Sequence, residues 1–278
     1  MRFTKAHGIG NDFIIVSERD VPAEWAKWAI RLCDRNRGIG GDGILIVGVD
    51  ATSRIARMKL LNPDGTDGEI SGNGVRCVAA YAFSRGLLPK AHTVLPPPGP
   101  RPVVVEQTGP RQFSVDTNLG VPGLSASSVP VAFGSKGRVV DHELNVDGEV
   151  VRVTCCSMGN PHTAVFVPEE EAESRMLRLG PKIENHPLFP NRTNVEFITV
   201  LSPRELRVRF WERGVGVTLS SGTGSASALV ASVLNERTDR EVTVHCAGGD
   251  LWESWPAEDA PLLQRGAVEI VYDGDWLG

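Results

Sequence analysis

The amino-acid sequence predicts an α+β protein made of two similar, strand-rich domains, each with one buried helix. Three observations support this prediction: an internal repeat, two helical patterns of small apolar residues, and many turn-forming residues. The chain has 278 residues and is 41% hydrophobic, which is enough for two cores. Thirty glycines and 19 prolines indicate many turns, and therefore short strands with few helices.

The internal repeat consists of two motifs that occur in the same order in each half. In the first half, Gly-Asn at residues 10–11 opens an apolar run, and Ser-Gly-Asn-Gly follows at residues 71–74. In the second half, Gly-Asn at residues 159–160 opens an apolar run, and Ser-Gly-Thr-Gly follows at residues 221–224. Because order and spacing are shared, we expect duplicated domains.

A helical pattern follows each Ser-Gly-X-Gly motif. Apolar residues recur at i, i+3, i+4, i+7 and i+8 in both, as Val75, Val78, Ala79, Ala82 and Phe83, and as Ala226, Leu229, Val230, Val233 and Leu234. Gly86 is placed to end the first helix. Most of these side chains are small or β-branched, as expected for a helix that runs through a sheet-lined core.

The other elements are one further helix and many strands. The helix is expected from Ala23 to Cys33, and the clearest strands at residues 43–47, 103–105 and 206–210. Residues 95–100, which are rich in proline, are interpreted as a rigid loop. We place the domain boundary before the Pro/Ser-rich residues 121–130, so that residues 1–119, completed by 266–278, form one domain and residues 120–265 the other.

Composition and charge favour a soluble, cytoplasmic protein that binds small molecules. The net charge is −5 and there is no block of Lys or Arg, which argues against nucleic acid or an anionic membrane as a partner. No apolar run has the length of a membrane span, and none resembles a signal peptide. The five cysteines lack metal-site or disulfide spacing, so we expect them reduced and mostly buried; for Cys155 and Cys156, strand packing is favoured over a redox or metal role.

Each Ser-Gly-X-Gly motif opens a helix, where unpaired N–H groups and the positive end of the helix dipole form an anion site. A substrate carboxylate fits such a site, with Ser71 or Ser221 beside it. The alternative is that these serines only cap their helices. Because two such sites occur alike in duplicated halves, we expect a shared cleft between the domains.

The other motifs give weaker evidence about function. Residues 38–43 (Gly-Ile-Gly-Gly-Asp-Gly) match a dinucleotide-binding glycine pattern, but that motif follows a strand and opens a helix, whereas here the order is reversed. Polar residues lie near the serine motifs, with Asn62 before Ser71 and Glu212 at the same distance before Ser221. Taken singly, the asparagines are also explained as turn formers, Glu212 and Arg213 as an ion pair or solvated charges, and His162 as a structural histidine.

Six motifs together resemble one known family. They are residues 7–13 (HGIGNDF), 62–65 (NPDG), 72–77 (GNGVRC), 158–162 (MGNPH), 194–197 (NVEF) and 212–216 (ERGVG). In content and order they resemble the diaminopimelate epimerase family, over nearly the whole chain. The resemblance implies two pseudo-symmetric domains, each a curved, mostly antiparallel sheet around a central helix, and a homodimer is common in the family.

The resemblance also implies the chemistry. Family members invert the α-carbon of an amino acid without cofactor or metal, one cysteine removing the α-proton while a second delivers a proton to the opposite face. The residues that would bind the reacting carboxylate are Gly72, Asn73, Gly222 and Thr223. The amino group would be positioned by Glu212 and the backbone of Arg213. The rest of the substrate would be held by Asn11, Asn62, Asn160, Asn194 and the Arg213 side chain. His162 and Glu212 would assist the two bases.

The departures from the family pattern fall on the reacting groups. Ser71 and Ser221 occupy the positions of both catalytic cysteines, and Val217 replaces a glutamate. A serine hydroxyl ionises far above the range that a helix N-terminus makes accessible to a thiol, so proton removal should be slow. Because the neighbouring Ser220, Ser225 and Ser227 also differ from the family pattern, natural divergence is preferred over engineered mutation.

We therefore expect an epimerase that interconverts LL- and meso-diaminopimelate, a lysine and peptidoglycan precursor. Ser71 and Ser221 would be the catalytic residues, assisted by His162 and Glu212. Two alternatives remain open at this point. One is a divergent lyase or isomerase acting on another amino acid, and the other is a non-catalytic amino-acid-binding protein.

Overall fold

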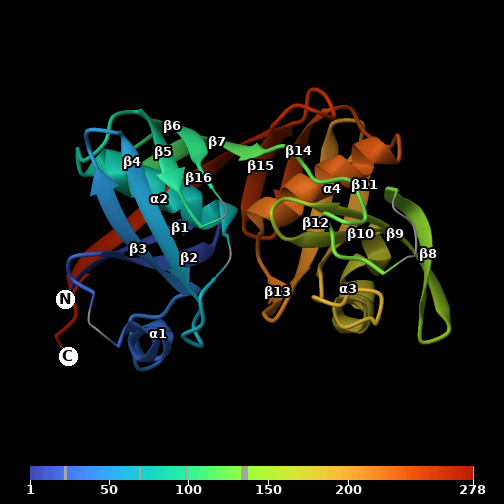
Figure 1. The fold of residues 1–278 in the computed structure, drawn as a ribbon, viewed down its shortest axis with the longest axis horizontal. Helices are drawn as coiled ribbons and strands as arrows, with labels where there is room; N and C mark the ends of the chain where they lie inside the picture. Colours follow the sequence, from blue (N-terminus) through green and yellow to red (C-terminus); the bar gives the residue numbers. More distant parts are fainter. Residues whose placement is uncertain (22–23, 69, 98, 133–136, 278) are drawn as a thin grey trace. The chain divides into compact units, whose positions relative to one another are not determined.

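The computed structural model describes residues 1–21, 24–68, 70–97, 99–132 and 137–277. The chain divides into two compact units, Met1–Asn118 with Arg265–Gly278, and Leu119–Gln264. Each junction lies one residue from the boundary expected from the sequence. Both ends of the chain belong to the first unit, where the Met1 amino group donates to the Trp276 carbonyl at 2.8 Å (Figure 1).

The first unit is a closed sheet around one helix. Its strands are β1 (Arg2–Gly8), β2 (Asn11–Ser17), β3 (Gly43–Asp50), β4 (Ile55–Leu61), β5 (Ala91–Leu95), β6 (Arg101–Gln107), β7 (Gln112–Gly120) and the C-terminal part of β16 (Leu262–Asp275). They follow one another in that order, and antiparallel pairing of β1 with β16 closes the sheet. Helix α2 (Gly72–Ser84) packs against β1 to β6, and α1 (Trp25–Cys33) lies against β3.

The second unit repeats this plan. Its strands are β8 (Val139–Val146), β9 (Glu149–Ser157), β10 (Pro161–Phe166), β11 (Asn194–Ser202), β12 (Glu205–Glu212), β13 (Gly216–Thr218), β14 (Glu241–Cys246), β15 (Gly249–Ser254) and the first residues of β16. The order in the sheet is β8-β9-β10-β11-β12-β14-β15-β16, with β13 paired to β12. Helix α4 (Gly222–Leu234) packs against β9 to β12, β14 and β15, whereas α3 (Glu169–Glu184) packs against β8 and β11 to β13.

The strand pairings confirm the duplication that the motifs predict. In the first unit, β2 pairs parallel with β3 across α1, and β4 pairs parallel with β5 across α2. In the second unit, β10 pairs parallel with β11 across α3, and β12 pairs parallel with β14 across α4. The remaining pairings with a recorded direction are antiparallel, so each sheet is mostly antiparallel as expected.

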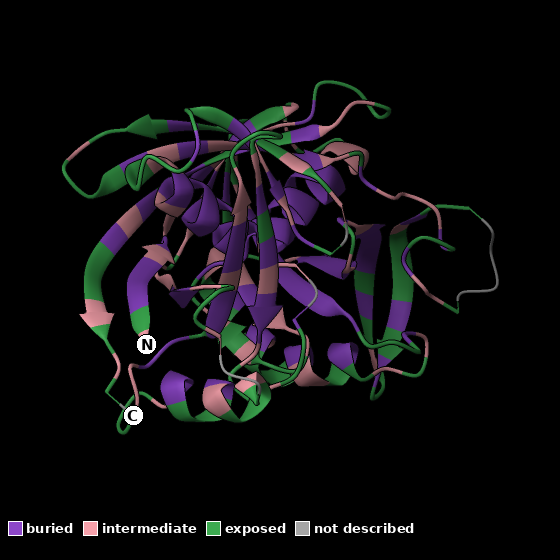
Figure 2. Ribbon diagram, turned by 60° about the vertical axis from the view of Figure 1, so that its left-hand side comes forward, coloured by how far each residue is buried: buried purple, intermediate pink, exposed green. Residues whose placement is uncertain are grey.

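Both central helices are buried along most of their length, as their small apolar residues predict (Figure 2). Glycine allows close packing in their first turns, because a Cβ on Gly224 would lie 2.9 Å from the Phe210 ring and one on Gly74 3.1 Å from the Met58 methyl group. Helix α2 ends at Ser84, and Gly86 follows with φ +66°, where its N–H donates to the Phe83 carbonyl at 2.9 Å. Gly86 therefore ends this helix as predicted.

The structure differs from the helix predictions at two places. Helix α1 begins at Trp25, and Ala23, where the sequence placed its start, lies outside the described residues. Helix α3 was not predicted at all. The sequence does carry a helix signal there, with three glutamates in the first turn and Ala172, Met176, Leu179 and Ile183 on one face, but Pro181 inside the pattern obscures it.

The other local expectations can be compared with the structure directly. All five cysteines are free, four are buried, and Cys155 and Cys156 are consecutive residues of β9, as expected from strand packing. The proline-rich residues 95–100 join β5 to β6, with a turn in which the Gly99 N–H donates to the Pro96 carbonyl; Pro98 itself lies outside the described residues. Within the described part of the chain, no helix combines the length and hydrophobicity needed to cross a membrane.

Candidate active site

Ser71 and Ser221 are the N-cap residues of α2 and α4. Both have extended backbone conformations, and each hydroxyl oxygen accepts a hydrogen bond from the backbone N–H three residues ahead, of Gly74 at 3.0 Å and of Gly224 at 3.1 Å. Capping is therefore an observed role of both serines. It does not consume the hydroxyl proton, which stays available for donation to a second partner. The first turns leave N–H groups for an anion, as at any helix N-terminus.

Ser221 has such a second partner in Glu212, the last residue of β12. The Ser221 hydroxyl lies near enough to lower the pKa of the Glu212 carboxyl, and because Gly224 is the donor in the cap, the hydroxyl proton is available to that carboxylate. Burial raises the pKa of Glu212 above its ordinary value, although hydrogen bonds from Ser221 and Thr218 and the charge of His162 oppose this. A carboxylate with a raised pKa is a stronger proton acceptor at neutral pH.

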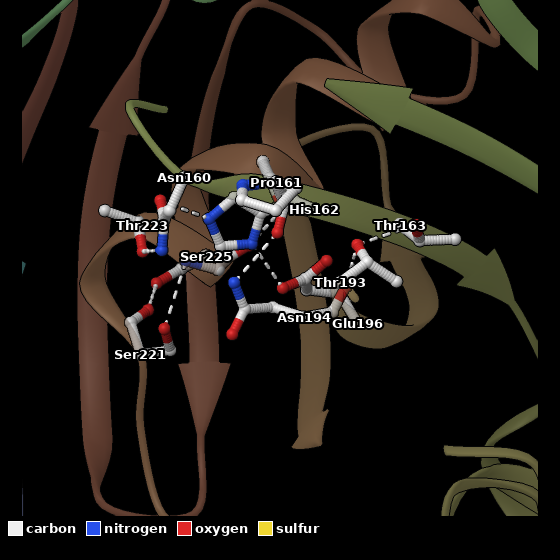
Figure 3. Close-up of polar contacts among 12 residues, drawn as sticks. Asn160, Pro161, His162, Thr163, Thr193, Asn194, Glu196, Ser221, Thr223 and Ser225 are labelled. Carbon is white, nitrogen blue, oxygen red and sulfur yellow. Dashed lines mark hydrogen bonds and ion pairs between the residues drawn. The ribbon is translucent and has the colours of Figure 1, made fainter. Parts of the chain in front are cut away.

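His162 belongs to a chain of hydrogen bonds that ends at the same helix (Figure 3). Its Nδ1 lies 2.7 Å from Glu196 Oε1 and its Nε2 lies 2.9 Å from Asn160 Oδ1. The Asn160 amide then donates to the Thr223 hydroxyl at 3.4 Å. His162 and Glu196 are each 1% exposed. His162 thus reaches the first turn of α4 through Asn160, whereas Glu212 is a neighbour of Ser221 itself.

Glu196 was not singled out from the sequence, although it lies within the NVEF motif. A signal was present, because Asn194 and Glu196 alternate with apolar residues on a strand and so share one face. The parallel register of β10 and β11 pairs His162 with Asn194 and Ala164 with Glu196. This register places the Glu196 carboxylate beside the His162 imidazole. The contact depends on the pairing of two strands and so is decided by the tertiary structure.

Asn194 and Arg213 are brought together around a turn. The Asn194 carboxamide accepts from the Arg213 N–H at 3.0 Å and donates to the Pro161 carbonyl at 2.8 Å. The Arg213 guanidinium donates to the Asn191 carbonyl at 3.0 Å. In this arrangement Asn194 connects the 212–215 turn to the start of β10. The described second unit therefore assembles Asn160, His162, Asn194, Glu212, Arg213 and Ser221 around the N-terminus of α4.

The first unit holds its own polar cluster at α2. The Asn73 amide donates to Asn11 Oδ1 at 3.2 Å, the Asn11 amide donates to Asp42 at 2.7 Å, and Arg76 donates to Asn73. The neighbouring Asp12 is bridged by Lys5 and Arg35. Burial alone would raise the pKa of Asp12, but hydrogen bonds from these two cations outweigh it and hold that pKa at about 2.

The two units differ in the groups around their serines. Asn62, which mirrors Glu212, forms a turn by donating from its side chain to the Thr66 hydroxyl at 2.9 Å. By strand register, the first unit has Phe13 where the second has His162, and Leu45 where the second has Glu196. Acid–base groups therefore accompany Ser221, whereas the equivalent positions near Ser71 hold an amide and two apolar side chains.

The fold defines a class of protein. The structure resembles the solved structure of a probable proline racemase from Agrobacterium radiobacter, with a TM-score of 0.71 and 13% identity, covering 99% of this chain and 92% of that one. At this identity the likeness concerns the fold alone, which is that of the two-domain racemases and epimerases.

Sequence comparison narrows the class to a family. The family model described as "Diaminopimelate epimerase" matches residues 3–122 and 154–271. The diaminopimelate epimerase of Pelotomaculum thermopropionicum is 42% identical over 283 aligned residues, with 99% of each chain covered, and that of Heliobacterium modesticaldum is 41% identical over 281 with the same coverage. The chain belongs to the diaminopimelate epimerase family. It is accordingly an isomerase of the cofactor-independent amino-acid epimerase type, and the lyase and binding-protein alternatives are not favoured.

Proposed function

We propose that this protein interconverts LL- and meso-diaminopimelate by proton transfer at the α-carbon, in the supply of lysine and peptidoglycan precursors. The observation that carries the proposal is that Ser221, the N-cap of α4, has the Glu212 carboxyl as a neighbour. This arrangement places a hydroxyl group with a nearby proton acceptor next to an anion site that suits the α-carboxylate. The names of the relatives at 41–42% identity support the choice of substrate.

Proton removal is proposed to run through Ser221 to Glu212. The substrate carboxylate binds at the N–H groups of Gly222 and Thr223, and the positive end of the α4 dipole stabilises the negative charge that develops next to it. The α-proton passes to the Ser221 oxygen as the hydroxyl proton passes to the Glu212 carboxylate. The two transfers together give a substrate carbanion and a neutral Glu212 carboxyl, so no Ser221 alkoxide accumulates. His162, which is hydrogen-bonded to Glu196, stabilises the first turn of α4 through Asn160.

Ser71 is proposed to deliver its hydroxyl proton to the opposite face of the carbanion while taking up a proton from solvent water. Glu212 then releases its proton to the solvent, so that both groups regain their starting states. Inversion requires removal on one face and delivery on the other, and the duplicated Ser71 and Ser221 supply one hydroxyl for each. Gly72 and Asn73 at the start of α2 would share the carboxylate. The remaining contacts to the substrate are assigned to Asn11, Asn62, Asn160, Asn194 and Arg213.

The test is proton NMR of the purified protein with LL-diaminopimelate in deuterium oxide. We expect loss of the α-proton signal together with formation of the meso isomer, slowly with the unmodified protein. The doubly substituted Ser71→Cys, Ser221→Cys protein should react faster, because a thiol at a helix N-terminus ionises near neutral pH. No exchange by either protein, with both folded, would refute the proposal. Exchange with keto-acid release and no inversion would show lyase chemistry instead.

We also propose a cytoplasmic location and a homodimeric state. The five free cysteines suit a reducing compartment. The homodimer rests on the family resemblance alone. Light scattering coupled to size-exclusion chromatography tests it, since a monomeric mass across the working concentration range would exclude the dimer.

A further inference from the structure

Glu184, the last residue of α3, is a buried carboxylate that receives three donors. Its Oε2 accepts from the indole N–H of Trp211 at 2.8 Å. Its Oε1 accepts from the backbone N–H of Gly214 at 2.9 Å and from the Arg192 guanidinium at 3.2 Å. Glu184 itself is 5% exposed, whereas the Arg192 side chain is 53% exposed. A buried charge with this number of donors stabilises the particular conformation that supplies them.

Two of these donors flank the residues assigned to the chemistry. Trp211 precedes Glu212 in the chain, and Gly214 follows Arg213. The segment folds back in a turn in which the Val215 N–H donates to the Glu212 carbonyl at 3.0 Å, with Gly214 at φ +76°. Glu184 therefore holds the turn on both sides of Glu212 and Arg213.

The end of α3 also packs closely on Trp211. A Cβ built on Gly180 would lie 2.7 Å from Trp211 Cγ, so at this point glycine lets the helix approach the indole directly. Gly180 and Glu184 are four residues apart and share one helix face. The same face thus presents both the close contact to the ring and the acceptor for its N–H group.

The turn has little packing of its own. Val215 is 68% exposed and Val217 is 50% exposed, and β13, which follows the turn, is three residues long and pairs with β12. Exposed segments with few apolar contacts open easily unless they are anchored. The turn's anchors include Asn194, through the Arg213 N–H, the Asn191 carbonyl, through the Arg213 guanidinium, and Glu184, through the Gly214 N–H.

We propose that Glu184 is a positioning residue for the epimerase reaction, fixing the 211–214 turn so that Glu212 faces Ser221. The inference rests on the proposed function, in which Glu212 accepts the proton of Ser221.

The substitution Glu184→Gln tests the proposal, because it preserves volume but replaces one acceptor oxygen by a donor NH₂ group. At least one of the three donors then loses its acceptor. Trp211→Phe is the milder second variant, since it removes one donor and keeps an aromatic ring. The control is Glu171→Gln on the same helix, where the side chain is 53% exposed and pairs with Arg175 at 3.5 Å, away from the turn.

We expect kcat/KM of Glu184→Gln to fall by about 10- to 100-fold, as for a small displacement of a reacting group. Trp211→Phe should fall less, and Glu171→Gln should match the unmodified protein. The acid limb of the pH–rate profile should move to lower pH in Glu184→Gln, because burial raises the pKa of Glu212 and a loosened turn admits water. The charges that face Glu212, those of His162 and Glu196, are unchanged in this variant.

Amide hydrogen exchange of residues 211–216 separates this proposal from the proposed function. Exchange there should be faster in Glu184→Gln and unchanged in Glu171→Gln. Unaltered exchange together with unaltered kcat/KM would overturn the positioning role, as would a fall in kcat/KM with both exchange and acid limb unchanged. Faster exchange in a protein whose unmodified form never turns over would refute the proposed function and show only that Glu184 anchors the 211–214 turn.

Discussion

The Ser221 hydroxyl has a cap partner and a carboxyl neighbour. Its oxygen accepts from the Gly224 N–H, which caps α4, and its proton is available to the nearby Glu212 carboxyl, whose pKa it lowers. Structural capping and proton transfer use different parts of the same hydroxyl group and so are compatible. Ser71 has the same cap, but the mirrored residue Asn62 is a poor proton acceptor. At the residue scale, the strongest base in the described site therefore belongs to the second unit.

Glu212→Gln tests this assignment. We expect kcat for α-proton exchange to fall about 10²- to 10⁴-fold, the usual contribution of a general base. In the unmodified protein, the rate should fall as pH drops through the Glu212 pKa, because a protonated carboxyl cannot accept the Ser221 proton. Burial raises this pKa, so the fall should occur above the pH at which ordinary glutamates titrate. Exchange followed by NMR across pH measures both effects.

We also expect Glu212→Gln to change the stability of the fold. A carboxyl whose pKa is raised in the folded state stabilises the fold while it is protonated, and this contribution is lost as pH rises through the folded-state pKa. Ionised Glu212 therefore costs stability at neutral pH. Glu212→Gln should raise the thermal midpoint at pH 7 and have little effect at low pH. Glu173→Gln, an exposed change on α3, is the control; a lowered midpoint at pH 7 would contradict this interpretation.

At the scale of elements, α3 and the 212–215 turn act together. Helix α3 joins β10 to β11 and contacts β12 and β13, so one helix borders both strands that supply Glu196 and Glu212. The equivalent helix of the first unit, α1, packs on β3 and lies in the chain between Asp12 and Asp42, which both pair with Arg35. Both units thus have a helix at the equivalent position, but the residues near the two helices differ in their chemistry.

Gly180→Ala tests the contact between α3 and Trp211. The added methyl group would meet Trp211 atoms at 2.7 to 2.9 Å, closer than real contacts allow, so the indole must shift. Alanine otherwise favours a helix by about 1 kcal/mol over glycine, so a raised thermal midpoint would show that no clash occurs. We expect instead a lowered midpoint and reduced kcat/KM. Gly137→Ala, at a position with open space around it, is the control.

At the scale of the whole molecule, the two units differ in how the chain builds them. The second unit is one continuous segment, Leu119–Gln264, whereas the first needs both ends of the chain. The first sheet closes only through the C-terminal part of β16, which pairs with β1 and neighbours β7. Without it, two strand edges would be exposed to aggregation.

Two fragments test this difference. Residues 119–264 expressed alone should unfold cooperatively on heating, because the fragment contains a complete core of its own. Residues 1–118 alone should aggregate or lack a cooperative transition, and adding residues 265–278 through a linker to Met1 should restore it. Circular dichroism with thermal melting gives both readouts. A cooperative, monomeric 1–118 fragment would show that closure by β16 is dispensable.

Local sequence patterns were sufficient for much of this protein. The 3.6-residue periodicity of small apolar residues located α2 and α4, and the repeated Ser-Gly-X-Gly motifs located their N-termini and the duplication. These are local properties, since a cap, a glycine turn and a helix period involve residues within a few positions of one another. The family motifs likewise located the polar residues around Ser71 and Ser221.

Only the tertiary structure decided which of those residues meet. Glu196 faces His162 because β10 and β11 pair in one parallel register, and Glu184 reaches Trp211 and Gly214 because α3 packs across β12. Such contacts join residues that lie far apart in the chain, and a shift of one residue in register would turn each side chain to the other face. The sequence determined the types of residue and their local conformations, and the packing of strands and helices decided that the Glu212 carboxyl lies near Ser221.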